Sequence, residues 1–343
     1  MNIDFYEEPN VGYNVYRLHF NENLFLPRAY YEEVLKVALD PDLVRYYTEP
    51  LNEGFNIRLA KFLGVDENSV FSTLGGDEAL LLLTILSLHG SREVTIVEPT
   101  YSMPSAIAGA LRLRVRQVLL RRGDFSLDPD DVVKAGRGSD VIYICNPNNP
   151  TGNVFEGSVI EEVVSRVDAL VIVDEAYAEF AGVTSIGLTR HYENVAVLRT
   201  FSKAWGLAGL RVGYVVSSPA VINALKRVSL PHNIPYPSIA MVSKALELKH
   251  YVDESVAKMV EVREWLFRRL GELDLNPLPS RANFITFHAP KPGLVHKALV
   301  ERGFVLRNLE GKVLCEDCLR ATVPPRPIAD RLIDALSEAL KAI

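Results

Sequence analysis

The chain is organised around residues 199–214, Arg199-Thr200-Phe201-Ser202-Lys203-Ala204-Trp205-Gly206-Leu207-Ala208-Gly209-Leu210-Arg211-Val212-Gly213-Tyr214. An apolar run, Val195-Ala196-Val197-Leu198, precedes them and predicts a buried strand. After this strand, small hydroxyl residues and glycines surround Lys203. A deprotonated lysine is a nucleophile that forms a Schiff base with a carbonyl compound.

Three neighbours of Lys203 indicate an anion. Thr200, Ser202 and Arg211 supply two hydroxyl donors and a fixed cation, which match a bound phosphate dianion. A carbonyl-reactive lysine beside a phosphate site suggests pyridoxal 5'-phosphate (PLP), which carries both an aldehyde and a phosphate. A lone Ser-Lys pair would more simply be a turn with a solvated lysine, but the complete pattern T-x-S-K followed by R-x-G favours the cofactor.

The stretch resembles the PLP-lysine signature of the class I/II aminotransferases, of the aspartate aminotransferase fold type. Its residue sequence is most similar to that of the histidinol-phosphate aminotransferases. Further matching segments extend from Asn21 to Arg320, so the resemblance covers nearly the whole chain. It implies an α/β fold, the PLP-dependent transferase fold type I, with a mostly parallel central sheet, helices on both faces and a smaller α+β domain.

The alternation of apolar strands with helical segments independently predicts a mostly parallel sheet. We expect an N-terminal arm over 1–30 that belongs to the small domain. A large PLP-binding domain is expected over 31–237, and a small C-terminal α+β domain over 238–343. By resemblance, the strand at 212–216 is the antiparallel member of the sheet.

Three motifs are expected to hold the cofactor. Gly76 and Asp77 begin an apolar helix after a glycine, where exposed backbone N–H groups bind phosphate. Tyr101, in Glu-Pro-Thr-Tyr, matches the aromatic residue that stacks on the cofactor ring. Asn149, in the specific motif N-P-N-N-P-T-G, matches the donor to the cofactor's phenolic oxygen.

Asp174 follows the apolar strand 170–173. The carboxyl end of a sheet strand is where α/β proteins bind ligands. The resemblance implies that Asp174 keeps the pyridine nitrogen protonated and that Tyr177 hydrogen-bonds the phenolic oxygen. A simple strand cap would leave an unpaired charge at the end of a buried run. Lys203, Asp174 and Tyr177 are therefore the expected catalytic residues.

The resemblance also assigns substrate contacts. Arg320, in Cys-Leu-Arg-Ala-Thr-Val, matches the arginine that binds the amino acid's carboxylate in a bidentate pair. Arg307 matches the arginine that binds the phosphate of histidinol phosphate. Asn23 lies in a segment similar to one along the mouth of the active site. Tyr47 matches a tyrosine that reaches into the partner subunit's site, and Tyr46 is the alternative.

The implied reaction moves an amino group between L-histidinol phosphate and 2-oxoglutarate, giving imidazole acetol phosphate and glutamate in histidine biosynthesis. A homodimer with shared active sites would carry it out. An aromatic amino acid aminotransferase and a threonine-phosphate decarboxylase of the same fold are alternatives. A non-catalytic PLP-fold binding or regulatory protein is disfavoured because Lys203, Asp174, Asn149 and Arg211 are all present.

The composition of the chain bears on whether it contacts nucleic acid, membrane or metal. The chain has 343 residues, of which 48% are hydrophobic, and its net charge of −6 gives no basic footprint for nucleic acid. With no signal-like or membrane-spanning apolar segment, we expect a cytoplasmic protein without membrane contact. Cys315 and Cys318 form a single C-x-x-C pair, whereas a zinc site needs about four ligands. We therefore expect no metal and two incidental thiols, with a disulfide as the alternative.

Overall fold

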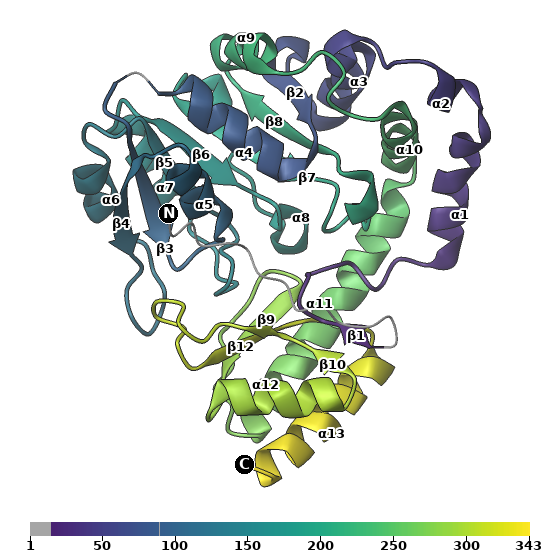
Figure 1. Cartoon of the computed structure of the whole chain (residues 1–343), viewed down its shortest axis with the longest axis vertical. Coiled ribbons are helices and arrows are strands. Elements are labelled where there is room, and N and C mark those ends of the chain that lie inside the picture. The colour runs from purple at the N-terminus through teal and green to yellow at the C-terminus, as the bar shows by residue number, and fades with distance from the viewer. Residues whose placement is uncertain (1–14, 89) are drawn as a thin grey trace.

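The computed structural model describes residues 15–88 and 90–343. It shows two bodies, one around a large sheet and one around a small sheet, with a long helix reaching from the first to the second (Figure 1). Residues 1–14 of the predicted N-terminal arm lie outside the described residues. Within the described ranges no helix is both long and apolar enough to cross a membrane.

The first body contains a seven-stranded sheet in the order β2-β8-β7-β6-β5-β3-β4. Neighbouring strands from β7 to β4 are parallel, whereas β8 runs antiparallel to both β7 and β2. The mostly parallel sheet and its antiparallel member are thus confirmed. The strands are β2 (Val70–Thr73), β3 (Glu93–Glu98), β4 (Arg114–Leu119), β5 (Val141–Cys145), β6 (Leu170–Asp174), β7 (Val195–Thr200) and β8 (Gly213–Ser217).

Helices cover both faces of this sheet, as the sequence predicted. Successive residues of β5 alternate between two cores: Ile142 and Ile144 pack in the core that includes α6 and α7, and Tyr143 packs in the core that includes α4, α5 and α9. A strand buried on both faces is a continuous apolar run, which explains the sequence of β5 and β6.

The α-helices and short 3₁₀ helices of the described residues are as follows. The α-helices are α1 (Arg28–Lys36), α2 (Asp42–Arg45), α3 (Glu53–Leu63), α4 (Gly75–Leu86), α5 (Met103–Ala110), α6 (Pro129–Gly136), α7 (Gly157–Ser165), α8 (Ala178–Ala181), α9 (Pro219–Val228), α10 (Tyr236–Glu247), α11 (Lys249–Glu272), α12 (Pro292–Glu301) and α13 (Arg326–Lys341). The 3₁₀ helices are η1 (Val37–Leu39), η2 (Pro50–Asn52), η3 (Glu67–Ser69), η4 (Ile186–Arg190) and η5 (Ala208–Leu210).

The second body is an α+β unit with an antiparallel sheet in the order β11-β12-β9. Its strands are β9 (Phe284–His288), β11 (Arg307–Asn308) and β12 (Cys318–Thr322). Helices α11, α12 and α13 pack around this sheet, and their apolar residues join its core. The short strand β1 (Tyr16–Arg17) pairs with β10 (Phe304–Val305), so this part of the arm lies against the second body.

The expected domain boundary between residues 237 and 238 falls just inside α10. Helix α10 packs against α1, α2 and α3 of the first body, whereas α11 packs against β9 and α13 of the second. The division at 237 therefore remains a prediction. The chain passes from packing on the first body to packing on the second between α10 and α11.

Candidate active site

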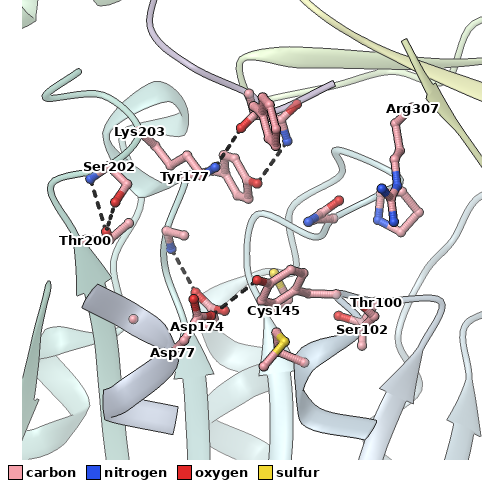
Figure 2. A pocket seen from close by; sticks show the side chains of 18 of the residues that line it. Asp77, Thr100, Ser102, Cys145, Asp174, Tyr177, Thr200, Ser202, Lys203 and Arg307 are labelled. Carbon is pink, nitrogen blue, oxygen red and sulfur yellow. Dashed lines mark hydrogen bonds between the residues drawn. The ribbon is translucent and has the colours of Figure 1, made fainter. Parts of the chain in front are cut away.

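A cavity of about 540 Å³ lies between the two bodies, where the carboxyl ends of β5, β6 and β7 face the second sheet. Figure 2 shows Thr200 and Ser202 at one side of it, Asp174 on its floor and Arg307 at the opposite side. All the residues expected to bind the cofactor line this cavity: Gly76, Asp77, Tyr101, Asn149, Asp174, Tyr177, Thr200, Ser202, Lys203 and Arg211.

Lys203 projects into the cavity from the segment after β7. Its Nζ donates a 2.8 Å hydrogen bond to the carbonyl oxygen of Phe20 and lies 5.8 Å from the centre of the Tyr177 ring. Burial, together with the nearby guanidinium groups of Arg320 and Arg211, lowers the pKa of Lys203 to about 8. The amine is therefore available in its nucleophilic, neutral form closer to neutral pH than an ordinary lysine.

Asp174 is the last residue of β6 and is almost fully buried. Its carboxylate accepts a 2.6 Å hydrogen bond from the Tyr143 hydroxyl and a 3.1 Å bond from the backbone N–H of Ala176. Burial raises the pKa of Asp174 to about 6, against the lowering effect of these two hydrogen bonds. A buried carboxylate of this kind favours a cationic partner in the cavity.

An anion cradle borders one end of the cavity. The Thr200 hydroxyl lies 3.0 Å from that of Ser202 and accepts a 3.1 Å bond from the Ser202 N–H. Thr200 pairs with Gly213 across β7 and β8, and the Arg211 guanidinium lies next to Gly75 at the start of α4. Two hydroxyls, a guanidinium and a helix N-terminus suit a phosphate group.

Two glycines make this close approach possible. A β-carbon on Gly213 would lie 2.7 Å from the carbonyl carbon of Gly75, so only glycine lets β8 approach the start of α4. Gly75 has φ +75°, and a β-carbon there would lie 2.9 Å from Nη2 of Arg211. Side chains at these positions would displace the guanidinium and the helix start, so the cradle fits the phosphate of PLP.

The cavity wall above Asp174 is a connected polar network. Arg320 donates from Nη1 to Oδ1 of Asn149, and Asn21 donates a 2.9 Å bond from Nδ2 to the Tyr177 hydroxyl. Burial raises the pKa of Tyr177 above its usual range, so its hydroxyl stays protonated. Tyr101 donates a 3.2 Å bond to Asp77 at the rim of the cradle.

The two arginines expected to bind substrate come from the second body and both line the cavity. Arg307 on β11 stands opposite Arg320 on β12 in the strand register. Arg320 is almost fully buried and donates a 2.7 Å bond from Nη2 to the carbonyl oxygen of His19. The antiparallel pairing therefore places the two cations on neighbouring strands. Arg307 lies at the end of the cavity away from the cradle (Figure 2).

The other two expected substrate residues lie outside the cavity lining. Asn23 is buried and donates to the Ala204 carbonyl at 2.7 Å and to the Ser255 hydroxyl at 2.9 Å. It fixes the arm against the Lys203 segment, and Asn21 two residues earlier is the asparagine that reaches the cavity. Tyr47 is 82% exposed, with its ring centre 4.8 Å from that of His232.

Several cavity residues were not anticipated from the sequence. Asn21 holds Tyr177, and Tyr143, which does not itself line the cavity, holds Asp174. Lys312 lines the cavity and forms a 2.9 Å ion pair with the buried Glu98. His19 also lines it, and burial lowers its pKa to about 4, so its ring is neutral.

Comparison with known proteins agrees with this geometry. Residues 10–336 match the family described as aminotransferase class I and II. The chain belongs to the class I and II aminotransferases. A histidinol-phosphate aminotransferase of Thermoanaerobacter sp. (strain X514) is 33% identical over 342 residues, covering 98% of this chain and 95% of the relative.

Two solved structures show the same fold. The histidinol-phosphate aminotransferase of Sinorhizobium meliloti, in complex with pyridoxal-5'-phosphate, has a TM-score of 0.84 at 26% identity, covering 96% of this chain and 91% of that one. A tetra mutant of the Thermus thermophilus aspartate aminotransferase has a TM-score of 0.81 at 19% identity, covering 97% and 98%. The expected fold type is confirmed.

This aminotransferase is a PLP-dependent transaminase. Three features of the cavity suit PLP. They are the phosphate cradle, the buried carboxylate of Asp174 and the amine of Lys203, whose lowered pKa favours its neutral form. The cofactor, when bound, supplies an aldehyde that captures amines and a ring that accepts electrons.

Proposed function

We propose that this aminotransferase transfers the amino group between L-histidinol phosphate and 2-oxoglutarate, giving imidazole acetol phosphate and glutamate, in histidine biosynthesis. The observation that carries the proposal is the pairing of Arg307 with Arg320 in one cavity, opposite the phosphate cradle. Each of these substrates carries an anion that a guanidinium can bind in a bidentate pair. The name of the relative from Thermoanaerobacter supports the same substrate.

Each polar group of the cavity has a role in this proposal. Lys203 Nζ takes the proton from the substrate's amino-bearing carbon and returns it, because its lowered pKa allows both states near neutral pH. Asp174 holds a proton on the cofactor's ring nitrogen. Asn149 and Tyr177 donate to the phenolic oxygen of the cofactor.

The remaining residues bind the phosphate and the ring of the cofactor. Gly76, Asp77, Thr200, Ser202 and Arg211 hold the cofactor's phosphate. The ring of Tyr101 covers the cofactor ring, while its hydroxyl is fixed by the bond to Asp77.

We also propose that the active unit is a homodimer with shared active sites. Tyr47 is exposed on a surface that includes further large apolar side chains, and such a surface suits a subunit interface. These exposed side chains are Leu39, Val44, Tyr46, Tyr47 and Leu230. In the homodimer Tyr47 would enter the partner's cavity and contact the substrate.

The substrate assignment is tested by a kcat/KM panel of histidinol phosphate, phenylalanine, tyrosine, aspartate and threonine phosphate. Histidinol phosphate should be the best amino donor. Arg307→Leu should lower kcat/KM for histidinol phosphate by about 100-fold, because a charge-assisted pair contributes roughly 1.5–3 kcal/mol. The same variant should change the value for phenylalanine only slightly, since that substrate has no anion at this end.

Arg268→Leu is the matched control, because it removes an exposed guanidinium on α11 outside the cavity. It should leave every substrate unaffected. An aromatic amino acid that exceeds histidinol phosphate by about tenfold or more (about 1.4 kcal/mol) would identify an aromatic aminotransferase. Release of carbon dioxide from threonine phosphate would identify the decarboxylase.

A further inference from the structure

Three metal-ligand side chains converge at one end of the β9–β12 pair, outside the active-site cavity. β9 ends at His288 and β12 begins at Cys318, and the antiparallel register places these two residues directly opposite each other. Asp317 precedes Cys318, and its backbone carbonyl accepts a 2.8 Å bond from the N–H of Ala289. Strand pairing therefore fixes all three residues at the same point.

The donor atoms are spaced as ligands of one ion. Nδ1 of His288 lies 3.6 Å from Sγ of Cys318 and 2.9 Å from both carboxylate oxygens of Asp317. Asp317 Oδ1 lies 3.8 Å from Sγ of Cys318. A tetrahedral zinc ion bound at about 2.3 Å from sulfur and 2.0–2.1 Å from nitrogen holds these two atoms roughly 3.6 Å apart.

The same atoms do not form a nucleophile relay. In such a relay the nucleophile and the carboxylate contact opposite nitrogens of the imidazole. Here Cys318 and Asp317 both face Nδ1 of His288, and Cys318 is fully buried. Donors gathered around one point suit a cation between them instead.

We propose that His288, Asp317 and Cys318 bind a zinc ion whose fourth position is taken by a water molecule. The thiol of Cys318 gives up its proton to solvent as the sulfur–zinc bond forms, and the His288–Asp317 hydrogen bond opens around the ion. One thiolate and one carboxylate then balance the two charges of the metal, and neutral imidazole completes the protein ligands.

Cys315 lies beside this site but is not one of the grouped ligands. It is fully buried, and its thiol interacts with that of Cys318. Both thiols are free in the structure.

The bound ion would stabilise the loop that forms one side of the active-site cavity. Residues 309–317 connect β11 to β12, and Leu309 and Lys312 of this loop line the cavity. Asp317 ends the loop, and β12 continues to Arg320. Zinc bound between His288 and Cys318 would tie the end of the loop to β9.

The experiment uses the full chain with its cofactor and without an affinity tag, stripped of metal by a chelator. Zinc is added in competition with a chromophoric chelator at pH 8, and cobalt(II) serves as a spectroscopic probe. We expect one ion per chain, a cobalt–thiolate charge-transfer band, and a melting temperature that rises with zinc. If the unaltered protein shows no charge-transfer band, the proposed zinc site is wrong, whatever the variants show.

Matched variants identify the ligands. Cys318→Ser and His288→Asn should each weaken zinc binding by about 100-fold or more, because loss of a ligand costs more than the roughly 10–100-fold loss seen for an outer-shell partner. Cys315→Ala and the exposed His191→Asn should bind zinc nearly as the parent does. Equal weakening in Cys315→Ala would overturn the ligand set. Thiol counting on the denatured, unreduced protein should find all three cysteines; loss of two thiols would show a disulfide and overturn the proposal.

Discussion

The hydroxyl of Tyr143 donates a 2.6 Å hydrogen bond to Oδ2 of Asp174, between the neighbouring strands β5 and β6. Both side chains are buried on the face of the sheet that carries α4. Burial raises the pKa of Asp174, and this hydrogen bond is the first interaction that opposes the rise. Tyr143 therefore positions the carboxylate and favours its ionised form.

Tyr143→Phe should lower kcat by roughly tenfold, because a hydrogen bond to a charged group contributes about 1.5–3 kcal/mol. KM for the amino donor should change little, since Tyr143 is not expected to contact substrate. Steady-state kinetics separate the two parameters. Tyr192→Phe, which removes a hydroxyl bonded to Glu161 outside the cavity, is the control. A change confined to KM would contradict a role through Asp174.

Asp174→Asn should alter the pH dependence of stability in the cofactor-free protein. Burial raises the pKa of Asp174 from 3.8 to about 6, so the folded chain binds this proton more tightly than the unfolded chain. The stability from this site is present below pH 3.8 and is lost as pH rises to about 6. The variant avoids the loss and should be more stable than the parent above pH 6.

The gain should reach about 3 kcal/mol, from a difference of about 2.2 pKa units at 1.36 kcal/mol each. Denaturant unfolding near pH 7 and near pH 4.5 measures it, and a gain equal at both values would contradict the cause. With cofactor, the same variant should transaminate slower by on the order of a thousandfold, because a neutral amide cannot hold the ring nitrogen protonated.

The sequence could predict that the residues expected to hold the cofactor lie together, because most of them belong to a local motif at the end of a strand or the start of a helix. Asp174 ends β6, Thr200 ends β7, and Gly76 is the second residue of α4. Parallel strands bring such ends together at one edge of the sheet. The fold and most of the cavity therefore follow from short segments read one at a time.

The remaining residues depend on register and on side-chain direction, which short segments do not specify. Tyr143 is one apolar residue within a strand until β6 supplies its partner. Asn21 and Asn23 belong to one motif, yet Asn21 has φ +57° and meets Tyr177, whereas Asn23 turns to Ser255. His288 lies far from Cys318 in sequence, and only the antiparallel pairing joins them.

Lys203 should react with amine reagents at lower pH than an ordinary lysine. Burial and then the charge of Arg320 lower its pKa from 10.5 to about 8. In cofactor-free protein, the labelling rate at Lys203, followed by peptide mapping across pH, should reach half its maximum near pH 8. Arg320→Leu should move this midpoint upward, and Arg268→Leu should not. A midpoint near 10 in the parent would reject the account.

Tyr47 is an expected substrate residue that could reach an active site only in a second copy of the chain. It is 82% exposed and does not line the cavity of its own chain. Val44 and Tyr46, close to it in sequence, are also exposed large hydrophobic residues. If this surface is the subunit interface, Tyr47 and Lys203 of one active site belong to different chains.

Mixed dimers test this arrangement directly. Tyr47→Ala and Lys203→Ala should each be nearly inactive alone, because every site of either homodimer lacks one group. After subunit exchange at equal concentrations, half of the dimers should be hybrids, each with one intact site, so activity should recover to about a quarter of the parent value. Mixing Lys203→Ala with Asp174→Asn is the control, since both changes fall in the same subunit's part of the site and no hybrid is intact. Exchange without recovery in the Tyr47 mixture would place Tyr47 outside the active site, and a monomer by light scattering would exclude a shared site altogether.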